Sequence, residues 1–269
     1  MAACRRCCQH TAVQGATWFE RARRQRAARA LERQLEYQTA KAASLAPLHE
    51  KVIEGMKSAS SRVRSRVKAV QALPAGCRTL AVGSGAHGLI FFFDTDRGIG
   101  IDPLAVSYSV LFPRWQRRAM IIAALGEALP LRTGSFDVVL SDNVVDHAQT
   151  PAAIVEEMAR VLAPSGVMYF TVNVHHPIYA IASAIHAAWN AVGIRFEIGP
   201  FADHTTHLTV SAARQLFRRL PLRIVSESVN RAEAKEAARK LRPRHLGGWI
   251  KRAFFKNVLY EVIAIRQPS

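Results

Sequence analysis

Short apolar runs separated by helical segments mark the middle of the chain. Between residues 74 and 172 these runs lack the strict alternation of a strand with one solvated face, as expected for parallel strands covered on both sides. The segment 152–162 instead carries Ile154, Val155, Met158 and Leu162 at helical spacing. The pattern predicts a parallel α/β sheet with strands at 79–82, 99–102, 120–123, 136–141 and 166–172.

The first 73 residues have a different pattern. Ala, Arg, Gln, Glu and Leu dominate residues 17–71, which predicts helix. Pro47 interrupts this stretch, so we expect two helices that separate there. Leu31, Leu35 and Gln38 fall on one helical face. We expect a basic helical N-terminal extension at 1–73, beginning with a loose terminus, and one domain at 74–269.

The end of the chain continues the strand pattern after an interruption. We expect a helix at 211–220, a strand at 222–229 and a last strand at 257–266. The segment 177–193 is uncharged and rich in Ala and Ile. It is interpreted as part of a cap that covers a substrate, with a helix packed on the core or on a second copy in a homodimer as the alternative.

Charge is concentrated at the two ends. Residues 1–73 carry a net charge of +10, residues 74–200 of −2, and residues 201–269 of +9. An anionic partner and solvated helix faces are both open interpretations, and the basic segment 231–256 favours peripheral membrane contact or a solvated insertion. Cys4, Cys7, Cys8 and Cys77 complete no zinc motif, so we expect no metal and a cytoplasmic location.

A glycine-rich loop carries the first chemical signal. Gly83, Ser84, Gly85 and Gly88 follow a predicted strand, where glycines let a ligand approach the backbone closely. Asp102 ends the next predicted strand, where its carboxylate can accept both hydroxyls of a ribose. Together these features predict an adenosine-type cofactor.

The chain resembles the class I S-adenosylmethionine-dependent methyltransferases. The resemblance rests on residues 79–85 (TLAVGSG), 100–103 (GIDP), 126–130 (GEALP), 134–141 (GSFDVVLS) and 156–166 (EEMARVLAPSG). It implies a doubly wound, mostly parallel seven-stranded sheet of Rossmann-like type, with a cap insertion after strand five at about 173–208. It also implies S-adenosyl-L-methionine as the cofactor.

The resemblance assigns cofactor-binding residues. They are Val82, Gly83, Ser84, Gly85, Gly88, Asp102, Pro103, Glu127, Ala128, Ser141, Asp142 and Asn143. Glu127 and Ala128 are expected to border the adenine. Ala81 departs from the family, which usually has an acidic residue there to help hold the methionine end. Asp142 is a candidate replacement for that carboxylate.

Histidines follow several strand ends and the cap. These are His147, His175, His176, His204 and His207, which we expect on the ligand side of the sheet. A neutral imidazole there can take the proton of a hydroxyl that attacks the methyl group. His147 and His176 are the preferred candidates for this catalytic base.

The sequence thus predicts O-methylation of a small molecule, lipid or glycan. RNA or protein methylation guided by the basic flanks is the enzymatic alternative. A non-catalytic binding protein with the methyltransferase fold is a third hypothesis, which Ala81 favours. Because residues 78–172 hold the whole cofactor signature, the N-terminal extension is not expected to be needed for cofactor binding.

Overall fold

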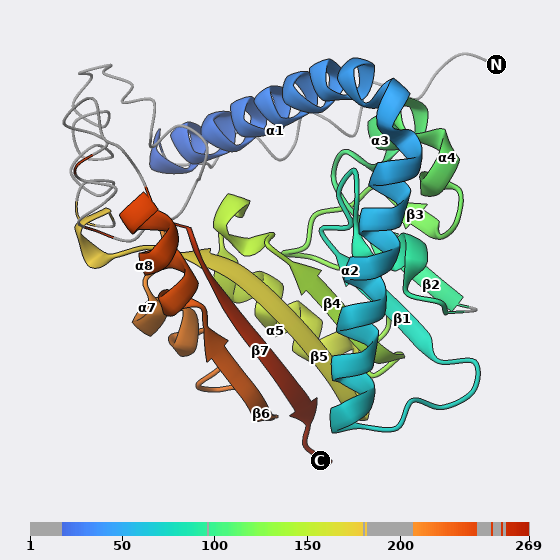
Figure 1. The fold of residues 1–269 in the computed structure, drawn as a ribbon. Helices are drawn as coiled ribbons and strands as arrows, with labels where there is room; N and C mark the ends of the chain where they lie inside the picture. The colour runs from blue at the N-terminus through green and yellow to red at the C-terminus, as the bar shows by residue number, and fades with distance from the viewer. Residues whose placement is uncertain are drawn as a thin grey trace.

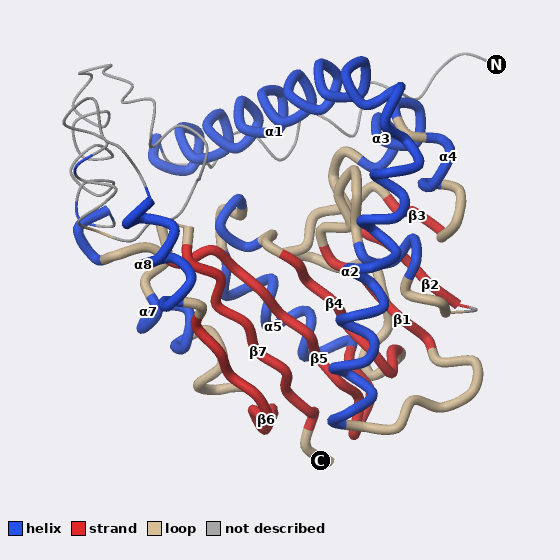
Figure 2. Tube along the Cα trace, viewed as in Figure 1, coloured by secondary structure: helices blue, strands red, loops and turns tan. Residues whose placement is uncertain are grey.

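The computed structural model describes residues 18–95, 97–179, 181, 207–240, 249, 254 and 257–268. In this part of the chain, seven strands form one sheet in the order β3-β2-β1-β4-β5-β7-β6 (Figure 2). Strand β7 runs antiparallel to both of its neighbours, and the other strands run parallel. The predicted mostly parallel seven-stranded fold is confirmed. The strands are β1 (Arg78–Val82), β2 (Arg97–Ile101), β3 (Met120–Ile122), β4 (Phe136–Asp142), β5 (Leu162–Val174), β6 (Leu222–Val229) and β7 (Val258–Arg266).

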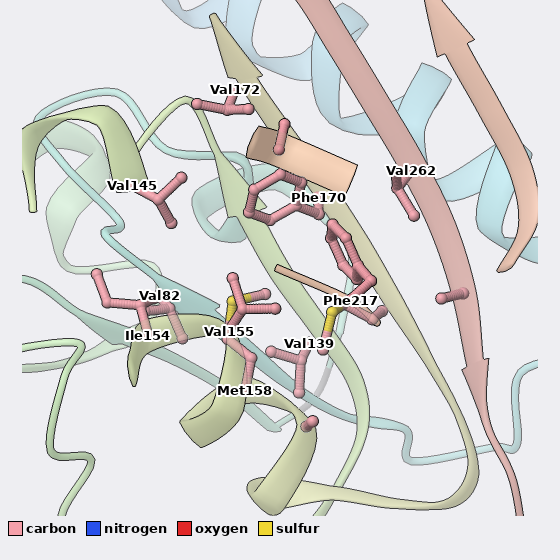
Figure 3. Close-up of a cluster of buried hydrophobic side chains, with 14 of the residues drawn as sticks. Val82, Val139, Val145, Ile154, Val155, Met158, Phe170, Val172, Phe217 and Val262 are labelled. Carbon is pink, nitrogen blue, oxygen red and sulfur yellow. The ribbon is translucent and has the colours of Figure 1, made fainter. Parts of the chain in front are cut away.

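Successive strand residues face opposite sides of the sheet, and this alternation divides the core into two clusters. Met168 and Phe170 of β5 lie in the cluster under α5 (Pro151–Val161), together with Phe217 (Figure 3). Val167 and Tyr169 of the same strand lie in the cluster on the other face. Both faces of the central strands are therefore buried, which explains why their sequences do not alternate between apolar and polar residues.

The N-terminal extension forms two helices, α1 (Trp18–Leu45) and α2 (His49–Val70), as Pro47 predicted. A 3-10 turn (Ala46–Leu48) connects them. Helix α2 covers one face of the sheet, and α1 crosses above the sheet (Figure 1). The remaining helices are α3 (Ala105–Leu111), α4 (Pro113–Gln116), α7 (Val210–Gln215) and α8 (Arg231–Lys240), with 3-10 turns at Leu89–Phe92 and Val145–His147.

Helix α2 is fixed to the sheet by apolar and charged contacts. Met56, Val63 and Val67 are buried against it. Arg66 Nη2 lies 2.5 Å from Oε1 of Glu261, whose Oε2 accepts a hydrogen bond of 2.9 Å from the Tyr169 hydroxyl. Glu261 is only 6% exposed, so the cation compensates a carboxylate that the interior would otherwise disfavour. Helix α2 is thus an integral part of the domain.

Most predicted elements differ from the structure by one or two residues, and two differ by four or five residues at one end. Strand β5 begins at Leu162 rather than Gly166, because its register against β4 shifts between the pairs Phe136–Leu162 and Val138–Val167. Ser165 adopts a positive φ of 60° within this irregularity. Helix α7 ends at Gln215 and continues as turns, so it is shorter than the predicted helix at 211–220.

Most of the expected cap at 173–208 lies outside the described residues, as do His204 and the cysteines at positions 4, 7 and 8. Among the helices of the described segments, none is both long and apolar enough to cross a membrane.

Candidate functional site

A cavity of about 780 Å³ lies at the carboxyl ends of β1, β2 and β4. The strand order reverses between β1 and β4, since the chain proceeds from β1 to β2 and β3 on one side and to β4 and β5 on the other. Loops diverge at such a point in a parallel sheet and leave a crevice for a ligand. The cavity therefore lies where the topology favours binding.

The glycine loop forms the floor of this cavity. The amides of Gly83 and Ser84 both donate to the carbonyl of Ile101, at 2.8 and 2.9 Å. Gly83 has a φ of +69°, and a β-carbon there would overlap the Val144 side chain at 2.3 Å. At Gly88 a β-carbon would lie 2.0 Å from the carbonyl oxygen of Ser84. Glycine is therefore required at both positions for this loop to close.

Side chains of helix α4 fix the glycine loop through hydrogen bonds to its carbonyl groups. The Trp115 indole donates to the carbonyl of Ala86 at 2.7 Å, and the Gln116 amide donates to the carbonyls of Gly85 and Ala86. The His87 ring packs beside the Phe112 and Trp115 rings, with centroid distances of 4.9 and 5.4 Å. Burial, and secondarily Lys41, lowers the pKa of His87 to about 4, so this imidazole is neutral at pH 7.

Asp102 joins the loop to the end of β2. Its Oδ2 accepts from the Gly85 amide at 2.9 Å, and its Oδ1 accepts from the Leu104 amide at 2.8 Å. Burial raises the pKa of this carboxyl, while the two amides oppose the shift. Each carboxylate oxygen can accept more than one hydrogen bond, so acceptor capacity remains for the two hydroxyls of a ribose.

Carboxylates and amides also follow β3 and β4. Glu127 Oε1 accepts from the Gln149 amide at 3.2 Å, which ties the loop after β3 to the segment before α5. Asp142 Oδ1 accepts from the Thr171 hydroxyl at 2.6 Å, and Asn143 has a positive φ of 58°. These contacts fix two polar walls of the cavity.

Helix α1 forms a wall that the sequence did not predict. Six of its residues line the cavity, and Gln34 hydrogen-bonds the Tyr108 hydroxyl. The lining residues from α1 are Ala30, Leu31, Arg33, Gln34, Tyr37 and Gln38.

Three described lining residues carry a buried polar atom without a hydrogen-bond partner: Gln38 Oε1, Ser84 Oγ and His87 Nε2. The Gln38 residue is 7% exposed. Because buried polar atoms normally have partners, these three atoms are candidate ligand contacts.

The predicted histidines do not all converge. His147 lines the cavity, with Nε2 3.8 Å from Oδ1 of the buried Asp146. His175 and His207 are buried against each other, with ring centroids 4.9 Å apart, and do not line it. His176 packs on Phe254 at 4.8 Å. His175 turns inward because its amide pairs with the carbonyl of Leu208 and its Nδ1 accepts from the Asn257 amide.

Most of the predicted cofactor residues meet at the cavity. Ala128 and Ser141 are absent from its lining, although Ser141 is buried beside it in β4. The lining also contains three residues that the sequence did not predict as site residues: Gln38, His87 and Tyr108. For Gln38 alone the sequence held a signal, because this residue shares one helical face with Leu31 and Leu35. The predicted residues in the lining are Val82, Gly83, Ser84, Gly85, Gly88, Asp102, Pro103, Glu127, Asp142 and Asn143.

Part of this sequence is similar to known proteins. Residues 80–170 match the family model of a methyltransferase domain. An uncharacterized methyltransferase of Mycolicibacterium gilvum (strain PYR-GCK) is 36% identical over 99 residues, which cover 35% of this chain and 38% of the relative. One from Mycobacterium sp. (strain KMS) is 31% identical over 144 residues, covering 52% and 48%. The matches thus span less than half of each relative.

Solved structures show the same fold at low identity. A proposed sarcosine dimethylglycine methyltransferase from Galdieria sulphuraria is 16% identical, with a TM-score of 0.56 over 78% of this chain and 86% of its own. Geranyl diphosphate C-methyltransferase from Streptomyces coelicolor A3(2) is 14% identical, with a TM-score of 0.54 over 81% and 83%. The described residues thus have the fold of the class I S-adenosylmethionine-dependent methyltransferases, and residues 80–170 form a methyltransferase domain by sequence.

Proposed function

We propose that the chain transfers the methyl group of S-adenosylmethionine to a hydroxyl of a small molecule, lipid or glycan. The observation that carries the proposal is the single cavity that gathers the glycine loop, Asp102 and His147 beneath α1. Its volume of about 780 Å³ falls in the range of roughly 300–1,000 Å³ typical of small-molecule sites. The Streptomyces coelicolor neighbour holds S-adenosyl-L-homocysteine, which supports this choice of cofactor.

The residues of the cavity fit that cofactor. Asp102 offers acceptors for the ribose hydroxyls, and Glu127 lies where the adenine is expected. The glycine loop lines the cavity, and the buried Gln38 Oε1 offers an acceptor for the ammonium group of the methionine portion. When bound, the cofactor supplies a methyl group activated by its positively charged sulfur. The chain then has to align the acceptor and exclude water, which α1 favours by covering the cavity.

His147 is the candidate for the catalytic base. A neutral alcohol is a poor nucleophile, so a group near the methyl has to take its proton as the new bond forms. Of the described candidate histidines, His147 alone lines the cavity, and its Nε2 lies 3.8 Å from Oδ1 of Asp146. Of the two histidines that the sequence analysis prefers, His147 and His176, we therefore keep only His147 as the proposed base.

Methyl transfer from labelled S-adenosylmethionine to a panel of alcohols, lipids, glycans, RNA and proteins tests the proposal. With the hydroxyl acceptor that reacts, His147→Ala should lower kcat by roughly 10²-fold or more and leave cofactor affinity unchanged. His176→Ala is the matched comparison and should have a small effect. Labelling of RNA or protein alone would contradict the acceptor class. Failure to bind the cofactor would favour a non-catalytic protein.

A further inference from the structure

A second cavity, of about 770 Å³, lies at the opposite edge of the sheet, where the parallel strands begin. Four arginines line it together with apolar and hydroxyl side chains, and the described part of its lining, which excludes Asp96, contains no carboxylate. The described lining residues of the two cavities do not overlap. Its lining residues are Arg78, Thr95, Arg97, Gly98, Ile99, Arg117, Arg118, Ala119, Met120, Ser135 and Phe136.

The fold brings the four guanidinium groups together from separate segments. Arg78 and Arg97 are the first residues of β1 and β2 and pair directly in the parallel register. Arg117 and Arg118 follow α4 and precede β3, which pairs with β2 from Ile99 and Met120 onward. Like charges placed side by side in a sheet are destabilising, and an anion bound between them reduces this cost.

Two of the guanidinium groups are held in place by the protein. Arg78 binds Asp137 through Nε at 3.1 Å and Nη2 at 2.7 Å. Arg118 donates from Nε to the carbonyl of Phe91 at 2.9 Å, and its guanidinium lies 4.6 Å from the centroid of the Phe92 ring. Fixed side chains lose little conformational entropy when a ligand binds, and both retain further N–H donors.

The charge of this cavity is only partly compensated. Asp137 offsets the charge of Arg78. Within the described ranges, which exclude Asp96, no carboxylate forms an ion pair with Arg97, Arg117 or Arg118. Arginine forks are well suited to phosphate oxygens, which accept paired hydrogen bonds.

The rest of the lining indicates an organic anion of small-molecule size. Ile99, Ala119 and Met120 provide an apolar surface beside the arginines, and Met120 is 64% exposed. A nucleic-acid track typically adds exposed aromatic rings on which bases stack. Phe136, the aromatic residue among the described lining residues, is buried at 5% exposure. We propose that this cavity, named here the arginine cleft, binds an organic diphosphate such as a nucleoside diphosphate.

Calorimetry on the full chain with uridine diphosphate tests the proposal, in the presence of saturating S-adenosylhomocysteine to keep the other cavity filled. The double variant Arg97→Ala/Arg117→Ala should lose at least about tenfold in affinity, since charged hydrogen bonds are removed. Inorganic pyrophosphate should bind more weakly than uridine diphosphate, because it lacks a group for the apolar surface.

The matched control is the double variant Arg218→Ala/Arg219→Ala, which removes two positive charges just after α7 and away from the cleft. This variant should bind uridine diphosphate like the wild type. An equal loss in both double variants would show a general charge effect and overturn the proposal. It would also be overturned if uridine diphosphate did not bind, or if pyrophosphate bound equally well. Tighter binding of a 12-nucleotide RNA that depends on Arg97 and Arg117 would assign the cleft to nucleic acid instead.

Discussion

The two edges of the sheet carry cavities of nearly equal volume but opposite chemistry. At the carboxyl edge, the cavity is built from backbone amides, the carboxylates of Asp102, Glu127 and Asp142, and α1 side chains that include a single arginine. At the amino edge, four arginines form the arginine cleft. Two cavities of similar size can therefore take different ligands, because the hydrogen-bond donors and acceptors in the wall determine which class of ligand binds.

The origin of the two cavities also differs. The carboxyl-edge cavity follows from topology, because loops separate where the strand order reverses between β1 and β4. The arginine cleft follows from long side chains around the starts of β1 and β2 and the segment before β3. Substitutions of backbone-fixing residues should therefore damage the first site, whereas substitutions of single charges should damage the second.

Among the expected effects on cofactor affinity, the largest comes from Asp102→Ala. This change removes the carboxylate assigned to the ribose hydroxyls and also frees the amides of Gly85 and Leu104. Loss of charged hydrogen bonds costs about 1.5–3 kcal/mol, so affinity for S-adenosylhomocysteine should fall at least about tenfold in calorimetry. The double variant Arg97→Ala/Arg117→Ala should keep the wild-type affinity. A loss in that variant would mean that the two edges are not independent.

A smaller effect is expected from removal of α1. A chain that begins at His49 keeps α2, whose Met56, Val63 and Val67 are buried on the sheet, and should fold with native circular dichroism. It loses the cavity wall that contains Gln38, so cofactor affinity should fall about 2- to 10-fold.

Gln38→Leu in the full chain separates the hydrogen bond from the wall itself and should give part of this loss. Unchanged affinity in both the shortened chain and the variant would restore the expectation that residues 78–172 suffice. A chain that begins near Leu73 is a poor test, since it also exposes the surface that α2 buries.

The smallest expected effect concerns the amino edge. The Arg78 guanidinium lowers the pKa of the Asp137 carboxyl. The pair therefore stabilises the folded state above the ordinary carboxyl pKa of about 3.9, and this contribution is lost as the pH falls through the lowered value. Asp137→Asn should reduce the free energy of unfolding by about 0.2–1 kcal/mol at pH 7.

Urea unfolding at pH 7 and near pH 2 measures this difference, which should vanish in acid. Asp94→Asn breaks the more exposed pair with Arg64 and should change stability less at pH 7. A difference between wild type and Asp137→Asn that persisted at pH 2 would assign the effect to something other than the charge.

The sequence predicts the elements well where the local pattern is strong. The apolar runs identify the strands, Pro47 separates α1 from α2, and glycines with acidic neighbours mark the carboxyl edge. Each of these signals has a local cause. Apolar runs reflect the burial of a strand on both faces, proline lacks the amide hydrogen that a helix needs, and glycine readily adopts the backbone angles of tight loops.

Features that depend on tertiary packing could not be predicted. The weak pattern of α1 identifies one face but not the surface that this face covers, so its position over the cavity was missed. Arg78, Arg97 and Arg117 lie far apart in the sequence and meet only because β1, β2 and β3 pair side by side. Likewise, strand order cannot show that His175 turns toward His207 and away from the cavity.

A crystal structure of the full chain with S-adenosylhomocysteine tests the central claim most directly. The account predicts the nucleoside in the carboxyl-edge cavity, with both ribose hydroxyls on Asp102 and α1 over the ligand. It also predicts that His147 is the candidate histidine nearest the sulfur, within about 8 Å, close enough to reach an acceptor hydroxyl. A ribose away from Asp102 would contradict the cofactor assignment, and His147 far from the sulfur would contradict its role as the base.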